Sequence, residues 1–240
     1  LASDTKRFYL EFWPSVSRIW KEKFHIHPVL LLFGDRRKCN VSSTYGDVVE
    51  VEPIPDVPTH LQAQWSRYWF PSTEPGTIWI TSDIDMYPIS RHYFIDLVNG
   101  IPEDRFVVLN SRGNYFPACY NVGTGACFKE VLGLPASFET SMQDVLATQR
   151  AHGHDHTPEG LDGYEKDASP SSLCQWGIDE ARASLMIRQY PRQERIVRVT
   201  RPGGFCARRL DRTSWHYSAQ DIEEGYYLDC HCPRPYSTHR

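Results

Sequence analysis

The chain has 240 residues, and its 26 Lys and Arg against 30 Asp and Glu give a formal net charge of −4. This length suits one domain with a substantial core, and 40% hydrophobic with 23% charged residues is ordinary globular usage, which excludes a disordered chain. The slight acidity gives no electrostatic basis for nucleic-acid binding. No apolar run approaches the roughly 20 residues that span a bilayer, so we expect no membrane span.

The predicted elements alternate between helix and strand along the chain. The first predicted helix is capped by Asp4 and kinked at Pro14. Further helices are predicted at 59–70, 88–99, 137–150 and 175–189, and strands at 27–33, 48–51, 77–81, 105–109, 195–200 and 225–230. This alternation predicts an α/β fold with helices on the faces of a sheet, as one domain over residues 1–240. A polar loop insertion is predicted at about 151–172.

Seven scattered cysteines without a C-x-x-C pair predict mostly reduced thiols. We therefore favour a reducing, cytoplasmic compartment. The chain begins at Leu1 rather than at Met, so the alternative is a lumenal protein whose N-terminal anchor has been removed.

Asp83 and Asp85 follow the apolar predicted strand 77–81 directly. Residues two apart on a strand point to the same side, so both carboxylates are expected to face one site at its carboxyl end. Two hard oxygen ligands suit Mg²⁺ or Mn²⁺ bridged to the phosphates of a nucleotide. The alternative is an acidic pair that caps the next helix or lies in solvent.

The segment 80–88 around this pair resembles the D-x-D segment of GT-A glycosyltransferases. Residues 1–4 look like the end of the family's first strand, where it contacts the nucleoside. Residues 60–67 are similar to the helix before the D-x-D strand, and 120–125 to the sugar-facing segment. Within the family, the chain resembles the small viral and algal enzymes that act on capsid or surface glycans. The first strand is much shorter than is usual there, which leaves the nucleotide's base hard to assign.

The resemblance implies a GT-A-like mixed central sheet flanked by helices and a nucleotide-diphosphate sugar as donor. The donor-binding residues that it implies are Ala2, Ser3, Asp4, Arg67, Asp83, Ile84, Asn121 and Gly123. Arg67 is the choice for the pyrophosphate, because its helix leads into the D-x-D strand. The basic cluster of Arg208, Arg209 and Arg212 could close over the phosphates, although a solvated surface is the simpler interpretation.

Many GT-A enzymes complete the metal site with a His or an acidic residue near the C-terminus. The resemblance favours His231, in the Asp-x-His-x-x-Arg-Pro segment 229–235, with His216 as the reserve. The expected ligand set for Mn²⁺ or Mg²⁺ is therefore Asp83, Asp85 and His231. Cys230 and Cys232 flank His231, but a zinc site lacks two more ligands at the required spacing.

Asp179 and Glu180 stand at the start of a predicted helix, where acidic residues are also favoured by the helix dipole. In GT-A enzymes an acidic residue at a comparable helix start often serves as the base or as a sugar contact. We therefore expect Asp179, and next Glu180, to be catalytic. For Asn121, Gly123 and Gly125 the alternative to a sugar contact is a plain turn.

The histidine run at 152–156 resembles the H-x-H-x-D-H run of metallo-β-lactamase-type hydrolases, but it is one residue short. It also follows a predicted helix instead of a buried strand. A solvated loop is the better interpretation of this run.

These observations predict a metal-dependent glycosyltransferase that moves a hexosyl or pentosyl group from a UDP- or GDP-linked sugar to a hydroxyl of a glycan or glycoprotein. One alternative is a sugar nucleotidyltransferase, for which the expected early Gly-rich phosphate loop is missing. Another is a non-catalytic glycan- or nucleotide-binding module, consistent with 13% aromatic residues.

Overall fold

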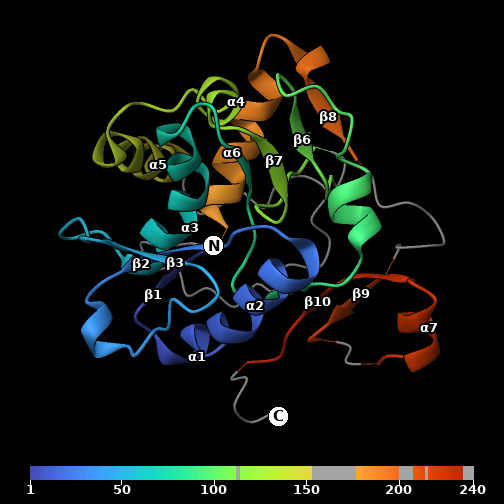
Figure 1. Ribbon diagram of the computed structural model, residues 1–240. Coiled ribbons are helices and arrows are strands. Elements are labelled where there is room, and N and C mark those ends of the chain that lie inside the picture. The colour runs from blue at the N-terminus through green and yellow to red at the C-terminus, as the bar shows by residue number, and fades with distance from the viewer. Residues whose placement is uncertain (112–113, 153–176, 200–207, 214–215, 235–240) are drawn as a thin grey trace. The chain divides into compact units, whose positions relative to one another are not determined.

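The computed structural model describes residues 1–111, 114–152, 177–199, 208–213 and 216–234 (Figure 1). The contacts divide the chain into two compact units. Unit 1 comprises Leu1–Pro53, Ser82–Ile101 and Arg201–Arg240, and unit 2 comprises Ile54–Thr81 and Pro102–Thr200. Most of the predicted polar loop and of the histidine run 152–156 lies outside the described residues.

The first sheet of unit 1 is parallel throughout. It consists of β1 (Ala2–Asp4), β2 (Val29–Phe33) and β3 (Asp47–Val51), with β2 in the middle. The register aligns Asp4 with Phe33 and Phe33 with Val51, so all three strands end at one edge. Strand β2 is buried along nearly its whole length, as its continuous apolar run predicts.

The second sheet of unit 1 has β10 (Tyr227–His231) between β5 (Met86–Pro88) and β9 (Arg208–Asp211). Strand β10 runs antiparallel to β5 and parallel to β9. The sequence analysis predicts β10 but neither of its two short neighbours.

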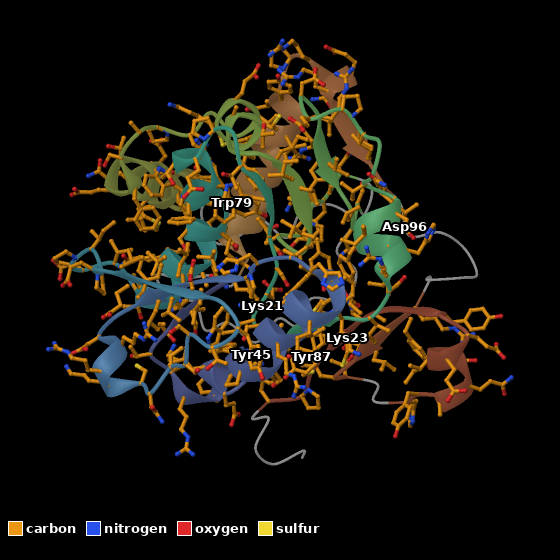
Figure 2. All side chains as sticks on the ribbon, viewed as in Figure 1. Lys21, Lys23, Tyr45, Trp79, Tyr87 and Asp96 are labelled. Carbon is orange, nitrogen blue, oxygen red and sulfur yellow. The ribbon has the colours of Figure 1, made fainter. Side chains whose placement is uncertain are left out.

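The first predicted helix is in fact two helices, α1 (Arg7–Leu10) and α2 (Trp13–Phe24). Pro14 does not kink a helix but lies in the first turn of α2. Backbone N–H groups there have no partner within the helix, so the lack of one in proline costs no hydrogen bond. The buried face of α2 packs Trp20 and Phe24 on Phe94, at centroid distances of 5.3 and 5.7 Å, while Lys21 and Lys23 are exposed (Figure 2). The other helical segments of unit 1 are η1 (Arg36–Lys38), the π-helix η3 (His92–Asp96) and α7 (Ala219–Glu223).

Unit 2 has a mixed sheet in the order β4 (Ile78–Ile80), β7 (Asn121–Thr124), β6 (Phe106–Val108) and β8 (Ile196–Arg198). The segment at 121–124, for which a plain turn was the alternative, is strand β7, antiparallel to both β4 and β6. The helical segments are α3 (Thr59–Trp69), η2 (Phe70–Thr73), α4 (Gly125–Val131), α5 (Phe138–His152), α6 (Ile178–Gln189) and η5 (Gln193–Arg195).

The core of unit 2 is rich in buried aromatic side chains from the helices and the sheet. Trp65 of α3 is buried and donates its indole N–H to Ser141 Oγ of α5 at 2.7 Å. Phe106 of β6 and Phe128 of α4 pack edge to face, with ring centroids 5.0 Å apart. In the part of the chain that the structure describes, no helix combines the length and the apolar character needed to cross a bilayer.

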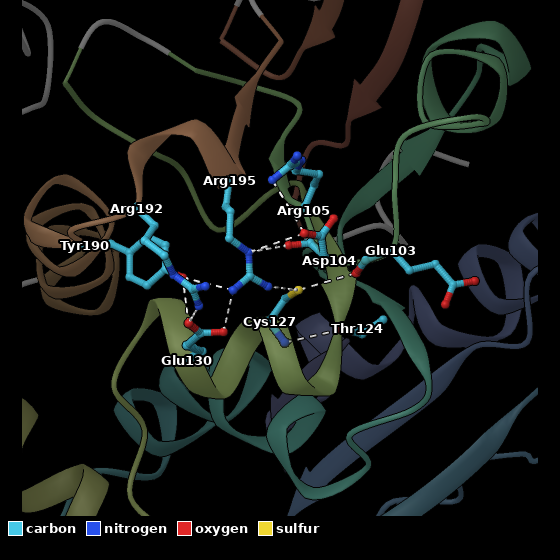
Figure 3. A network of polar contacts seen from close by, with 9 residues as sticks. All are labelled: Glu103, Asp104, Arg105, Thr124, Cys127, Glu130, Tyr190, Arg192 and Arg195. Atoms are coloured by element: carbon cyan, nitrogen blue, oxygen red, sulfur yellow. Dashed lines mark hydrogen bonds and ion pairs between the residues drawn. The ribbon is translucent and has the colours of Figure 1, made fainter.

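A polar network on unit 2 joins α4 to η5 (Figure 3). The Glu130 carboxylate accepts hydrogen bonds from Arg195 Nη1 at 2.7 Å and from the Tyr190 hydroxyl at 2.8 Å, and it also pairs with Arg192. Arg195 Nε donates to the carbonyl oxygen of Asp104 at 2.7 Å, just before β6. Every member of this network has a protein partner, so we interpret it as structural.

Candidate active site

The acidic pair of the D-x-D segment lies in a turn and not on a strand. Met86 N–H donates to the carbonyl oxygen of Asp83 at 3.2 Å, and β5 begins only at Met86. The expectation that Asp83 and Asp85 share one face of a strand end is therefore wrong, because strand β4 already ends at Ile80. Asp85 and Ile84 are buried, and Asp83 is partly exposed.

Strand pairing brings Asp85 to His231. In the β5–β10 ladder Met86 is opposite His231, and Cys232 N–H donates to the carbonyl oxygen of Asp85 at 2.9 Å. As a result, His231 Nε2 lies 3.5 Å from Asp85 Oδ2. The structure thus brings together two of the three predicted metal ligands, whereas His216 is exposed.

Two arginines also contact Asp85, whose side chain is only 7% exposed. Arg212 Nη1 lies 3.1 Å and Arg234 Nε 3.4 Å from the same Oδ2 atom that faces His231. Burial raises the pKa of Asp85, but the hydrogen bond with His231 and the charges of Arg234 and Arg212 outweigh it, so the pKa lies below its ordinary value. Asp85 is therefore held as a carboxylate.

The three arginines of the predicted basic cluster pair with different carboxylates. Arg208 pairs with Asp221 at 2.6 Å, and Arg209 pairs with the fully buried Asp229 at 2.6 Å. Arg212 alone of the three reaches Asp85.

Two further residues complete this cluster, and the sequence analysis misses both. Asp211 Oδ2 lies 3.4 Å from His231 Nδ1, because β9 and β10 pair with Asp211 opposite His231. Tyr9 of α1 lies under Arg234, with the guanidinium carbon 4.8 Å from the ring centroid, and its hydroxyl accepts a hydrogen bond from Arg234. We call Asp85, His231, Asp211, Arg212, Arg234 and Tyr9 the Asp85 cluster.

In the Asp85 cluster, only two of the three predicted metal ligands lie close enough together to bind one divalent cation. Two ligands of one ion, each about 2.1 Å from it at a right angle, lie about 3 Å apart, close to the observed separation of Asp85 Oδ2 and His231 Nε2. Among the described residues, however, no three His, Cys, Asp or Glu side chains are grouped to hold a metal. This also gives no support to a zinc site at Cys230 and Cys232, whose sulfur atoms lie 3.5 Å apart.

The predicted catalytic residue Asp179 belongs to unit 2 and is buried. Its Oδ2 accepts a hydrogen bond from Arg67 Nη2 at 3.0 Å, and the side chains are 1% and 8% exposed. Its Oδ1 has no hydrogen-bond partner among the described residues. Burying such an oxygen without a partner is costly, so this atom is a natural acceptor for a ligand hydroxyl.

Glu180 supports the segment that precedes β7. Its Oε1 accepts from the backbone N–H of Ala118 at 2.8 Å, and its Oε2 from the Tyr115 hydroxyl. Both carboxylate oxygens of Glu180 therefore accept hydrogen bonds from the protein, whereas only one oxygen of Asp179 does so among the described residues.

Asn121 and Thr81 connect the ends of β7 and β4. Asn121 N–H donates to Thr81 Oγ1 at 2.8 Å, and its side-chain amide donates to the carbonyl oxygens of Pro117 and Ala118 at 3.0 and 3.1 Å. The Asn121 Oδ1 atom has no partner among the described residues. A Cβ at Gly123 would lie 3.3 Å from Cys127 Cβ and 3.4 Å from Arg105 O, so packing favours glycine at this position.

Ala2, Ser3 and Asp4 form β1, and Asp4 lies at the carboxyl edge of the parallel sheet in unit 1. Ser3 and Asp4 are buried, and Asp4 accepts from Lys6 N–H at 3.1 Å. Ligands of open α/β sheets bind beyond this type of edge. The predicted nucleoside contact at residues 2–4 stays a prediction.

The elements and their order define an α/β fold of the GT-A glycosyltransferase type, as predicted, although the strands in the described part of the chain form three sheets rather than one. The chain is similar to galactosyltransferase LgtC, crystallised in complex with donor and acceptor sugar analogues. The likeness has a TM-score of 0.51 and covers 96% of this chain and 84% of that one, at 9% sequence identity. No protein-family model and no curated protein matches the sequence. This likeness shows the fold alone, and the resemblance to viral and algal enzymes stays a prediction.

Proposed function

We propose that the chain is a metal-dependent glycosyltransferase that uses a UDP- or GDP-linked sugar and a hydroxyl acceptor on a glycan or glycoprotein. The observation that carries this proposal is that the pairing of β5 with β10 places Asp85 next to His231. The two residues are distant in the sequence, and each comes from a segment that resembles a metal-binding segment of the family. The GT-A fold supports the same proposal.

We propose that Asp83, Asp85 and His231 hold Mn²⁺ or Mg²⁺. When bound, the cation would offset the charge that develops on the departing diphosphate. Asp83 belongs to the same turn as Asp85, in which its carbonyl oxygen accepts the N–H of Met86.

We propose Asp179 as the carboxylate that takes the acceptor proton or bonds a sugar hydroxyl, through Oδ1. Its partner Arg67 fixes the other oxygen. Glu180 is proposed to position the segment at 115–118, since both its oxygens accept hydrogen bonds from that segment.

We also propose that the donor is contacted by Ala2–Asp4, Arg67, Ile84, Asn121 and Gly123. The transferred sugar is proposed to be a hexosyl or pentosyl group. We also propose a reducing, cytoplasmic compartment, because the seven cysteines are scattered and form no C-x-x-C pair.

The test is thermal unfolding with UDP or GDP, with and without Mn²⁺. A ligand at 100 times its Kd stabilises the native state by about 2.7 kcal/mol, which is readily seen as a rise in Tm. We expect a rise that requires both ligands, is lost in Asp85→Asn and is retained in the control Asp47→Asn, an exposed carboxylate of unit 1. No shift with any nucleotide would refute the donor site. Binding without turnover of nucleotide sugars would instead support the binding-module alternative.

A further inference from the structure

Helices α3 and α6 of unit 2 carry a concentration of buried polar atoms without a hydrogen-bond partner. Within the described ranges these atoms are Gln64 Oε1 and the Tyr68 hydroxyl on α3, and Asp179 Oδ1 and Arg182 Nε on α6. The two helices are in contact, and the ion pair between Arg67 and Asp179 joins them. A buried polar atom without a partner is costly, so each one in a native protein calls for a water, a ligand or a functional role.

Helical spacing places these atoms on one face of each helix. Gln64 and Tyr68 are four residues apart on α3, and Asp179 and Arg182 are three apart on α6, so each pair lies along one helix face. Arg67, between the first two, bonds to Asp179, so this side of α3 is the one directed toward α6. The four atoms therefore come from the two helix faces that the ion pair brings together.

The Tyr68 hydroxyl is a fixed donor. Its side chain is fully buried, and its ring packs on Trp65 with the ring centroids 5.5 Å apart. Trp65 is held in turn by its hydrogen bond to Ser141. Burial and the charges of Glu180 and Asp179 raise the pKa of Tyr68 well above its ordinary value, so the phenol keeps its proton. A protonated phenol whose ring is held by packing is available as a donor to a ligand.

The oxygen Asp179 Oδ1 supplies the complementary acceptor. Arg67 bonds to the other oxygen, Oδ2, at 3.0 Å and so fixes the orientation of the carboxylate. Ile178 and Glu180, on either side of Asp179 in the first turn of α6, are partly exposed, so a ligand can approach from this end of the helix. A sugar hydroxyl needs both a donor and an acceptor, since it donates one hydrogen bond and accepts others.

We propose that Tyr68 determines donor specificity: its hydroxyl donates to, and Asp179 Oδ1 accepts from, the same hydroxyl group of the transferred sugar. The substrate is thereby a nucleotide sugar that carries a free hydroxyl at this position, and not its deoxy counterpart. This inference rests on the proposed function, because it assumes that Asp179 faces the sugar. An analogue without that hydroxyl would leave both protein groups buried and unpaired, and sites of this type reject such analogues strongly.

The first test compares Tyr68→Phe with wild type on nucleotide sugars and their monodeoxy analogues. The probes are UDP-glucose, UDP-galactose and GDP-mannose, each with its series of monodeoxy forms, and the measured quantity is kcat/KM. In wild type we expect one deoxy form of the accepted sugar to lose about 100-fold or more, and Tyr68→Phe to lose about 10-fold or more with the complete sugar. With that same deoxy form, the variant should equal or exceed wild type, because the group that Tyr68 would bond is already absent.

The second test needs no ligand and is therefore independent of the proposed function. Tyr68→Phe removes a buried hydroxyl that bonds to no described residue, so we expect Tm to be unchanged or raised. The matched control is Tyr190→Phe in the same unit, whose hydroxyl donates to Glu130 at 2.8 Å. This control should lower Tm by about 2–4 °C or more and leave the discrimination between complete and deoxy sugars unchanged.

Three results would overturn the inference. If Tyr68→Phe lowers Tm as much as Tyr190→Phe does, the Tyr68 hydroxyl has a partner within the protein, and the inference fails while the proposed function stands. If wild type uses a nucleotide sugar and Tyr68→Phe keeps the full preference for that sugar over every deoxy form, the specificity role fails alone. If wild type neither binds nor uses any of these nucleotide sugars, the inference and the proposed function fail together.

Discussion

Arg67 and Asp179, 112 residues apart in the chain, form a buried ion pair within unit 2, with Nη2 and Oδ2 3.0 Å apart. The charge of Asp179 raises the pKa of Arg67 against an opposing effect of burial, so the guanidinium stays charged. The pair joins α3 to α6 and fixes the carboxylate whose other oxygen is proposed to face the sugar.

Removing one partner of this pair is expected to be strongly destabilising. Arg67→Met leaves the Asp179 carboxylate buried and uncompensated, which typically costs about 3–5 kcal/mol. Urea unfolding measures the change. Arg18→Ala, which breaks an exposed i,i+4 pair with Glu22, is the control and is expected to cost under about 1 kcal/mol. Equal effects of the two variants would contradict the structural role of the buried pair.

Stability is expected to fall in acid partly through Asp211. Partial burial raises the pKa of its carboxyl, but hydrogen bonds from the Thr213 hydroxyl and N–H and the contact with His231 lower it below the ordinary value. A lowered folded-state pKa means that the stabilisation is complete above the unfolded value, about 4, and is lost as pH falls through the folded value. Urea unfolding between about pH 3 and 7 should therefore show that the free energy of unfolding of Asp211→Asn is lower than that of wild type at neutral pH and decreases less as the pH falls. An unchanged slope would contradict this prediction.

Gly34 should not tolerate a side chain. Its φ is +131°, and a Cβ there would lie 2.5 Å from Thr5 Cγ2, next to the end of β1. Gly34→Ala is expected to cost more than about 1 kcal/mol, measured by thermal unfolding. Gly76→Ala, where a Cβ would meet nothing within 4 Å, is the control and should be nearly neutral. A neutral Gly34→Ala would show that Thr5 moves freely.

The Glu130 network should contribute to stability without affecting ligands. Glu130→Gln removes the negative charge that faces Arg192 and Arg195, and we expect a loss of about 1–2 kcal/mol because several charges share it. The measurement is chemical unfolding together with the Mn²⁺-dependent nucleotide shift, which should persist. The exposed Lys129→Gln, on the same helix, is the control. Loss of the nucleotide shift in Glu130→Gln would show that the network is more than structural.

Strong local patterns made part of the fold predictable. The apolar run of β2 and the periodic helices α3 and α6 indicate an α/β protein from composition and spacing alone. Strands β5 and β9 were not predicted from the sequence, because each is short and β9 carries three charged residues. They are strands only because β10 pairs with both of them, a tertiary effect that local propensity does not contain.

The same reason limits prediction of the site. Asp85 and His231 stand in segments that resemble known motifs, so sequence alone makes them candidates. Asp211 joins them through the β9–β10 register, and Tyr9 through its stacking under Arg234. No local signal marks either of these two residues.

The position of His231 between two carboxylates also fixes the orientation of its ring. Asp211 faces Nδ1 and Asp85 faces Nε2, so the neutral ring can give its one proton to only one of them. Binding of a cation through Nε2 would leave Nδ1 to donate its proton to Asp211. Strand β10, by pairing with β9 on one side and β5 on the other, thus holds an imidazole whose two nitrogen atoms face carboxylates from both neighbouring segments.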